Sequence, residues 1–220
     1  PSTTRRKRTE LEPYRVRVPL RWVDLDAQGH ANNAAIVDYL QEARVAFLLT
    51  GPNAHLLGNG IIVVGHQVEY VAPIFFTPEP LDIELSVGDV GAARFTVGYV
   101  VRQGDTVVGR ARTLLANFDF QAGRPARLSD AERAWFLERQ VELEPMREVG
   151  SFDVGPDHHT LSFQVRWSDL DAYGHANNTR FYDYVAEARV ALKTPLLANS
   201  SRRNPHDEVE QAWMVVRQDM

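Results

Sequence analysis

A stretch of thirteen residues occurs twice in this chain of 220 residues. Residues 21–33 read R-W-V-D-L-D-A-Q-G-H-A-N-N and residues 166–178 read R-W-S-D-L-D-A-Y-G-H-A-N-N, with 11 of 13 positions identical at a constant offset of 145. The match continues into residues 38–46 and 183–191, which both carry D-Y and E-A-R-V-A. A duplication at this separation indicates two units of domain size, because solenoid repeats have much shorter periods.

The duplicated stretch connects an expected strand to an expected helix. Residues 14–21 alternate between apolar and polar side chains, which is the period of a half-buried strand. Residues 36–47 carry apolar side chains at helical spacing, which predicts an amphipathic helix. Between them, Gly29 can adopt a positive φ at little cost, and Asn32 or Asn33 is a good N-cap for the helix.

Each turn contains two carboxylates just before a helix N-terminus. They are Asp24 and Asp26 in the first copy, and Asp169 and Asp171 in the second. The free N–H groups and the dipole of a helix N-terminus favour negative charge. The pattern therefore predicts a carboxylate base next to a site that stabilises an oxyanion.

The composition excludes several classes of protein. A hydrophobic content of 44% is enough for two small cores, and the absence of cysteine excludes disulfides and thiolate chemistry. No apolar run approaches the ~20 residues of a spanning helix, and no signal-peptide core is present, so we expect a soluble, cytoplasmic protein that does not bind membranes. The first ten residues hold four of the 24 basic and one of the 29 acidic residues, which leaves 20 basic against 28 acidic in the body. That balance argues against a nucleic-acid partner.

The first unit is predicted to be one helix followed by a sheet. After the helix and an expected loop at residues 51–60, four strands are expected at residues 61–71, 81–87, 94–102 and 107–120. Ser129 and Glu132 form a capping box for a helix that ends near Gln140. An antiparallel sheet curled round one long helix suits this order, so the predicted fold class is α+β.

The predicted domain organisation has four segments: a disordered basic tail over residues 1–13, a first domain over 14–140, a linker over 141–156 and a partial second domain over 157–220. In the second domain the helix meets Pro195, and a polar insertion of seven residues precedes W-M-V-V at 213–216, which aligns with the strand that starts at residue 61. The chain stops opposite Val68, so three strands have no counterpart. We therefore expect the natural protein to continue, or this copy to borrow strands from another chain.

The motif D-L-D-A-Q-G-H-A-N-N, followed by Y-L-Q-E-A-R at residues 39–44, resembles the signature of the hotdog-fold acyl-CoA thioesterases, the group that includes 4-hydroxybenzoyl-CoA thioesterase. The resemblance covers residues 14 to about 120 well and 158–220 in part. It implies a sheet wrapped round a central helix, with active sites where two hotdogs pair. A tandem copy then implies a double hotdog, in which internal pairing replaces the usual homodimer and further homo-oligomers are possible.

The resemblance implies hydrolysis of an acyl thioester to a free acid and coenzyme A, without a metal or a bound cofactor. Carried over residue by residue, the catalytic carboxylates are Asp26 and Asp171, and the carbonyl-polarising donors are the backbone N–H groups near Asn33 and Asn178. The route by general base and the route by direct carboxylate attack both stay open. So does a simpler role for either Asp, which is to brace the loop as an Asx turn.

Other polar residues of the motif have two interpretations each. His30 and His175 either orient the substrate or bond locally within the turn, and Gly29 and Gly174 lie in the same substrate-facing turns but are explained by backbone geometry alone. Asp24 and Asp169 are expected to be hydrogen-bond acceptors that hold the turn. The charged pairs Glu42-Arg44 and Glu187-Arg189 are predicted to lie on helix surfaces, although a Glu on this helix is catalytic in some hotdog enzymes.

Competing motifs do not fit. D-x-D-x-Q-G imitates half a calcium loop, but Ala35 and Arg180 stand where a bidentate Glu is required. The residues after D-x-D do not match phosphatases with an aspartyl nucleophile, and the chain has no Gly-rich phosphate loop and no G-x-S-x-G. Two functional alternatives stay open: a thioesterase acting on acyl carrier protein, and a hotdog that binds acyl-CoA without hydrolysing it.

Overall fold

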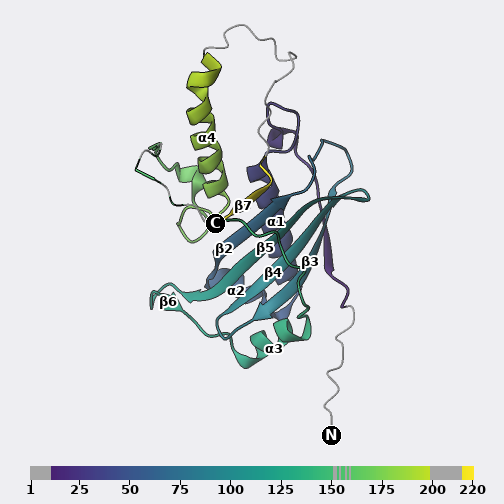
Figure 1. The fold of residues 1–220 in the computed structure, drawn as a ribbon. Helices are drawn as coiled ribbons and strands as arrows, with labels where there is room; N and C mark the ends of the chain where they lie inside the picture. Colours follow the sequence, from purple (N-terminus) through teal and green to yellow (C-terminus); the bar gives the residue numbers. More distant parts are fainter. Residues whose placement is uncertain (1–10, 151–152, 154, 157, 159, 199–214) are drawn as a thin grey trace.

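The computed structural model describes residues 11–150, 153, 155–156, 158, 160–198 and 215–220. An antiparallel sheet curls round one long helix, α1 (Asn33–Leu49), as expected (Figure 1). The strand order is β1-β3-β4-β5-β2-β7, and a short strand β6 (Arg124–Pro125) pairs with β5. The other strands are β1 (Tyr14–Val18), β2 (Ile61–Tyr70), β3 (Leu81–Val90), β4 (Arg94–Gln103), β5 (Thr106–Asp119) and β7 (Arg217–Asp219). The basic tail falls almost wholly on residues 1–10, which lie outside this description.

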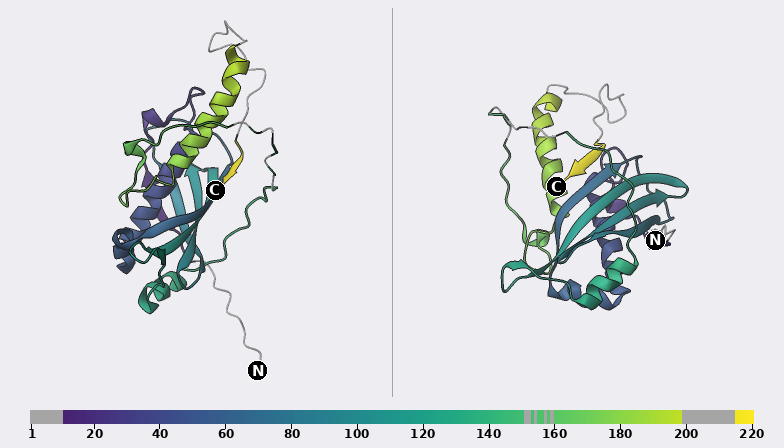
Figure 2. Two further views of the ribbon diagram at one scale, coloured as in Figure 1. Left: turned by 90° about the vertical axis from the view of Figure 1, so that its left-hand side faces the viewer. Right: turned by 60° about the horizontal axis from the view of Figure 1, so that its bottom comes forward.

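The second repeat contributes a helix and a strand at the β2 edge of this sheet. Helix α4 (Arg180–Ala198) contacts α1, and β7 pairs with β2 (Figure 2). Pro195 lies within the bounds of α4. The polar insertion and residues 213–214 of the W-M-V-V segment lie outside the described residues.

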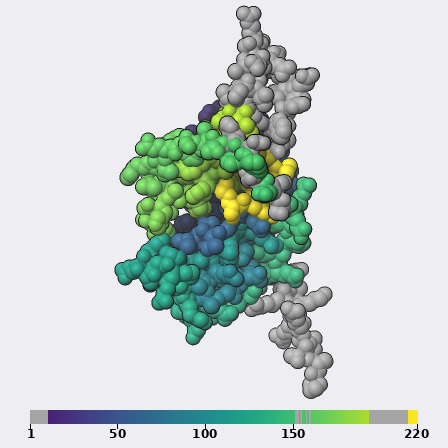
Figure 3. Space-filling model, turned by 60° about the vertical axis from the view of Figure 1, so that its left-hand side comes forward, coloured from purple at the N-terminus to yellow at the C-terminus, as the bar shows by residue number. Residues whose placement is uncertain are grey.

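The pairing of β2 with β7 follows a local two-fold axis. With the offset of 145 and the insertion of seven residues, Asp219 is the equivalent of Gln67, and these two residues are register partners. Backbone bonds between His66 and Met220 of 2.7 and 2.8 Å extend the same register. Equivalent segments of the two repeats therefore meet antiparallel at this seam. A space-filling view shows a hollow between the second repeat, in green, and the blue residues near β2, with purple atoms from the first part of the chain at its floor (Figure 3).

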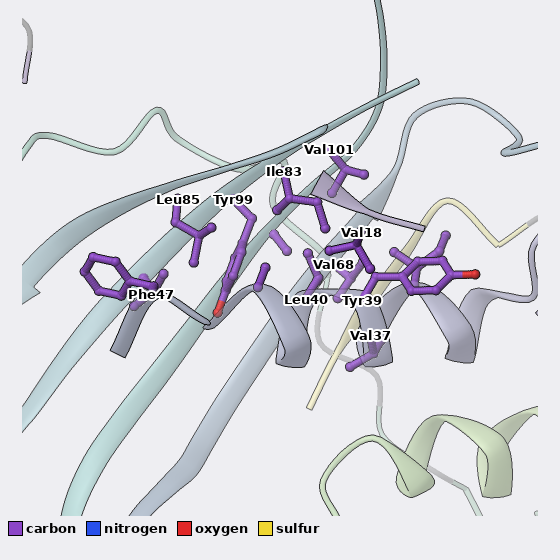
Figure 4. Packing of buried hydrophobic residues seen from close by; sticks show 14 of the residues in the cluster. Val18, Val37, Tyr39, Leu40, Phe47, Val68, Ile83, Leu85, Tyr99 and Val101 are labelled. Carbon is purple, nitrogen blue, oxygen red and sulfur yellow. The ribbon is translucent and has the colours of Figure 1, made fainter. Parts of the chain in front are cut away.

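The core lies between α1 and the inner face of the sheet. Leu40 from the helix meets Ile83 and Val101 from the strands, and Tyr99 extends from β4 toward the helix (Figure 4). Val37, also buried, lies on the other side of α1 and faces away from the sheet (Figure 4). A fully buried aliphatic side chain of this kind contributes about 1.5–3 kcal/mol relative to an exposed one. Burial of one helix face against one sheet face therefore holds the two layers together, as the helical spacing of the apolar residues predicts.

The prediction of a loop at residues 51–60 is wrong in part. This segment contains a 3₁₀ turn, η2 (Pro52–His55), and a short helix, α2 (Leu56–Asn59). Pro52 stands at the start of the first turn, where the missing N–H costs nothing, and the side chain of Leu56 is buried. Gly60 then has a φ of 129°, which ends the helix.

The capping box predicted before the last helix of the first unit is confirmed. Ser129 accepts from the backbone N–H of Glu132, whose carboxylate accepts from the N–H of Ser129. The helix, α3 (Asp130–Glu138), ends two residues before the predicted Gln140. Its Phe136 is fully buried and stacks on Phe95 with a centroid distance of 4.0 Å. The cap and this contact together close one end of the sheet.

The predicted linker is not a free segment in its first part, because it packs on the outer face of the sheet. The N–H of Val141 donates to the carbonyl of Val87 at 2.8 Å. Leu143 lies over two glycines, and a Cβ added to Gly88 or Gly98 would lie 2.6 or 2.7 Å from its methyl groups. Sequence patterns missed this contact because it depends on two glycines from different strands.

His55 connects the segment before β2 to α3. Its Nε2 lies 2.6 Å from Oε1 of Glu132, and this hydrogen bond raises the pKa of His55 above its ordinary 6.5. Burial raises the pKa of Glu132, but hydrogen bonds from His55 and Ser129 outweigh burial and lower it below 4.5. The protonated form of His55 stabilises the fold fully below pH 6.5, and this stabilisation is lost as the pH rises through the raised pKa of His55. The ionised form of Glu132 stabilises the fold fully above pH 4.5, and this stabilisation is lost as the pH falls through the lowered pKa of Glu132.

We therefore expect His55→Gln to be most destabilising between those two values. Because the His55 side chain is half exposed, the deficit in the free energy of unfolding should be at most about 1 kcal/mol near pH 5.5, and it should shrink near pH 8.5. Urea unfolding of the wild type and of His55→Gln at the two pH values measures this deficit. An equal deficit at both values would show that the charged pair does not contribute.

Candidate active site

The first turn is shaped by backbone hydrogen bonds around Asp26. The N–H of Asp26 donates to the carbonyl of His30 at 2.8 Å, and the N–H of Gly29 donates to the carbonyl of Asp26 at 3.0 Å. Gly29 has a φ of 78°, a conformation that side chains disfavour. This agrees with the explanation of Gly29 by backbone geometry.

The second turn repeats this geometry around Asp171. The N–H of Asp171 donates to the carbonyl of His175 at 2.8 Å, and the N–H of Gly174 donates to the carbonyl of Asp171 at 3.0 Å. Gly174 has a φ of 77°. The duplication has therefore kept the three-dimensional turn as well as its residues.

In both turns, one oxygen of the second aspartate is held and the other is free. Oδ1 of Asp26 accepts from the N–H groups of Gln28 and His30 at 2.8 and 3.3 Å. Oδ1 of Asp171 accepts from those of Tyr173 and His175 at 2.9 and 3.1 Å. Within the described part of the chain, neither Oδ2 has a hydrogen-bond donor. The turn-bracing role and the chemical role are thus compatible, since an oriented carboxylate with a free oxygen can act as a base or a nucleophile.

The helix after each turn begins with available N–H groups. Asn32 is the N-cap of α1, and its side chain accepts from the N–H of Ala34 at 3.0 Å. Asn33 is the first helical residue, and its backbone N–H has no acceptor among the described residues. In the second copy Asn177 accepts from the N–H of Thr179 at 3.1 Å, and α4 starts two residues later than its counterpart.

The backbone N–H of Asn178 is also without an acceptor in the part that the structure describes, while its side-chain Nδ2 donates to Gln41 of α1 at 3.4 Å. N–H groups at a helix start carry partial positive charge. Asn33 and Asn178 are therefore suitable oxyanion donors in their respective copies.

The first aspartate of each pair holds the turn, as expected. Asp24 accepts from the hydroxyl of Tyr39 at 2.6 Å and from the guanidinium of Arg21 at 2.8 Å. Burial, and then this bond to Asp24, raise the pKa of Tyr39. Asp169 accepts from the hydroxyl of Tyr184 at 2.9 Å. These carboxylates connect each turn to its own helix, and their oxygens already accept hydrogen bonds from the protein.

The second turn lies directly against the first repeat. The hydroxyl of Tyr173 donates to the carbonyl of Leu57, and burial raises the pKa of Tyr173. The ring of Phe120 lies 5.0 Å from that of Tyr173 and 5.3 Å from that of His175. The site at Asp171 therefore has walls from both repeats.

Sequence reasoning missed the residues of this wall. One signal was available: Tyr173 replaces Gln28 at one of the two positions where the thirteen-residue copies differ. In the first turn, the ring of His30 packs edge-on against Phe75 at 4.9 Å. The histidines thus contact aromatic walls through their rings and hold the turn through their backbones.

One predicted surface charge is in fact buried. Glu42 and Glu187 are exposed, but Arg44 is only 5% exposed and its Nη1 lies 3.4 Å from the hydroxyl of Tyr99. Arg44 follows Leu40 by four residues and so shares the helix face that meets the sheet. Arg189, its equivalent in α4, is partly buried.

Other features of the described residues bear on the expected partners. No three His, Asp or Glu side chains within the described ranges are grouped as metal ligands would be. Nor does any helix there have the length and apolar character needed to cross a membrane. A groove lined by Tyr14, Phe47, Thr50 and Trp135 lies at the C-terminal end of α1, away from its N-terminal turn.

Comparisons with known families cover most of the chain. The model of the Thioesterase-like superfamily matches residues 20–136, and that of the acyl-ACP thioesterase C-terminal domain matches residues 156–194. A search of curated proteins found no match.

Several solved structures with the same fold are named as thioesterases. The 12:0-ACP thioesterase from Umbellularia californica is 16% identical, with 80% of this chain and 74% of that chain covered and a TM-score of 0.65. An acyl-ACP thioesterase from Bacteroides thetaiotaomicron is also 16% identical, with 79% and 71% covered and a TM-score of 0.64. A thioesterase from Thermus thermophilus complexed with coenzyme A and Zn is 26% identical, with 58% and 94% covered and a TM-score of 0.52.

The predicted hotdog fold is confirmed by these structures, and the first family match spans more than half of the chain. The duplicated Asp turns lie at helix starts within that fold. The chain therefore belongs to the thioesterase-like superfamily and is a thioester hydrolase.

Proposed function

We propose that the chain hydrolyses acyl-CoA thioesters to free acids and coenzyme A at the Asp26 and Asp171 turns. The observation that carries this proposal is the shared geometry of the two turns, in which one carboxylate oxygen is fixed and the other is free beside a helix start. On one route the free carboxylate oxygen takes a proton from water as the water adds to the thioester carbonyl, and on the other the carboxylate adds itself. The backbone N–H near Asn33 or Asn178 stabilises the oxyanion, and the C–S bond then breaks to release the thiolate, which is protonated to the thiol. On the second route water then hydrolyses the anhydride to the free acid and restores the carboxylate. One preorganised donor of this type lowers the barrier by about 2.7–4 kcal/mol.

Of the two turns, we propose that the one with Asp171 forms the principal site. Its support is the wall that the first repeat supplies, through Leu57 and Phe120 against Tyr173 and His175. A site between two packed units excludes water better than an open turn, which strengthens its electrostatic interactions.

We propose further that the two repeats form a tandem double hotdog. The pairing of Gln67 with its equivalent Asp219 supports this arrangement, as does the contact of α4 with α1. Nη2 of Arg180 in α4 donates to both carboxylate oxygens of Asp38 in α1, with both distances 2.9 Å. This charge-assisted contact adds to the packing of the two helices.

The carrier of the acyl group has a second candidate. An acyl carrier protein thioester is favoured by the match of residues 156–194 to the acyl-ACP thioesterase C-terminal domain. A coenzyme A thioester is favoured by the likeness to the Thermus thermophilus thioesterase, which was solved with coenzyme A.

Thiol release from matched acyl-CoA and acyl-ACP thioesters tests both candidates. We expect turnover of acyl-CoA, with kcat/KM within about tenfold of that for the same acyl group on the carrier protein, because the proposed chemistry uses only the thioester and not the carrier. Turnover of carrier-protein thioesters alone would select the second candidate. Binding of both without release of thiol would contradict the proposed function.

A further inference from the structure

A group of buried polar atoms without partners lies where the two repeats meet. Within the described residues, both ring nitrogens of His66, the hydroxyls of Thr113, Thr179 and Tyr182, and Oδ1 of Asn178 have no hydrogen-bond partner. An unmet buried polar group of this kind costs about 1–3 kcal/mol. Several such atoms close together therefore call for an explanation, such as a bound molecule that supplies the missing hydrogen bonds.

Three of these side chains are neighbours under the sheet. His66 on β2 and Thr113 on β5 are register partners and both face inward, with 3% and 0% of their surfaces exposed. The ring of Tyr182, which is 2% exposed, meets that of His66 nearly edge-on at 5.8 Å. β2, β5 and α4 thus point polar groups at one place.

Arg44 makes this place positively charged. Its guanidinium, on α1, has one hydrogen bond, to Tyr99, and no carboxylate within ion-pair distance in the described part of the chain. Burial, and then the charge of Arg44, lower the pKa of His66 to about 3, so the imidazole is neutral. A buried cation without an anion is costly, and several kcal/mol are regained when it is paired. We call Arg44, His66, Thr113 and Tyr182 the inner polar cluster.

One member of the inner polar cluster belongs to the helix that follows the proposed site at Asp171. Tyr182 lies in the first turn of α4, four residues after Asn178, the candidate oxyanion donor. The ring contact of Tyr182 with His66 then connects this end of α4 to the rest of the cluster.

We propose that the inner polar cluster binds a carboxylate at the far end of the acyl group, so that the preferred substrates are thioesters of dicarboxylic acids. This inference rests on the proposed function. Arg44 offers several N–H donors, while His66, Thr113 and Tyr182 add one donor each, and a carboxylate is an acceptor-only group. A terminal hydroxyl would accept some of these bonds but would leave the charge of Arg44 without an anion.

The test compares suberoyl-CoA with octanoyl-CoA, which differ only at the far end. We expect the wild type to favour suberoyl-CoA in kcat/KM by at least about tenfold, the effect of one charge-assisted hydrogen bond. Arg44→Met replaces the guanidinium by an apolar chain of similar length and should bring this ratio close to one. The control is Arg15→Met, the same change at an exposed arginine of β1 that pairs with Glu84 at 3.0 Å, which should keep the ratio.

A wild type that favours octanoyl-CoA, or an Arg44→Met variant that keeps the preference for suberoyl-CoA, would overturn the proposal. If Arg44→Met does not fold, as judged by circular dichroism, His66→Leu provides the same comparison. Calorimetric binding of free suberate and octanoate needs no turnover. Suberate binding that depends on Arg44 would therefore support the cluster even if no thioester were hydrolysed, whereas hydrolysis without any preference would support the proposed function alone.

Discussion

Asp171→Asn, made together with Asp26→Asn so that no second turn remains, is expected to lower kcat/KM for the best thioester by at least about 100-fold, the usual contribution of a positioned base or nucleophile. The substitution is well matched to the geometry. The amide oxygen of Asn can still accept from the N–H groups of Tyr173 and His175, which are 2.9 and 3.1 Å from Oδ1, so the turn is retained. What is lost is the negative charge and basicity at Oδ2. Stopped-flow or steady-state measurement of thiol release gives the size of the loss. The affinity for acyl-CoA should be unchanged.

Asp26→Asn is the matched control, because its turn has the same internal hydrogen bonds. We expect it to lower kcat/KM by no more than about twofold, since the wall of Leu57 and Phe120 belongs to the Asp171 site. A large loss in Asp26→Asn with little loss in Asp171→Asn would reverse the assignment of the principal site. Full activity in both variants, and in the double variant, would mean that neither aspartate is catalytic.

Phe136→Ala is expected to give the largest loss of stability among single changes in the first repeat. Its side chain is fully buried and stacks on Phe95 at 4.0 Å, while Trp135 beside it packs on Phe47 at 5.2 Å. Truncating such a side chain leaves a cavity and costs about 3–5 kcal/mol in the free energy of unfolding. Urea or thermal unfolding at constant pH measures this value.

Glu138→Ala on the same helix is the control for Phe136→Ala. Its side chain is exposed, so the change should stay within about 0.5 kcal/mol. If Phe136→Ala costs no more than this control, α3 does not close the core as we describe.

Local patterns predicted most of the fold. The alternation of residues 14–21, the helical spacing of residues 36–47 and the capping box at Ser129 all report on neighbours along the chain, and each corresponds to an observed element. The buried position of Arg44 was missed because a charged side chain is expected at the surface. The spacing of four residues from Leu40, which places Arg44 on the buried face of the helix, was the better guide. Leu143 was missed because its partners, Gly88 and Gly98, are far away in sequence.

The candidate site was predictable for a related reason. Both Asp turns and both helix starts are contiguous in sequence, so the duplication itself drew attention to them. Phe120 and Leu57 come from other parts of the first repeat and approach Tyr173 only after the two repeats dock. No pattern within a single segment contains that information, and the same holds for the inner polar cluster.

The seam between β2 and β7 has a consequence for how copies of this chain recognise each other. In a dimer of identical subunits, the residue nearest the two-fold axis meets itself, so an aspartate there would face an aspartate. In this chain Gln67 meets Asp219, with its Nε2 donating at 3.3 Å, and Arg217 of the second copy reaches Glu69 of the first at 3.2 Å. Two strands like β7 from separate molecules would instead bring Asp219 against Asp219. The divergence of the two halves thus makes the second half a better partner for its covalent neighbour than for its own likeness in another molecule.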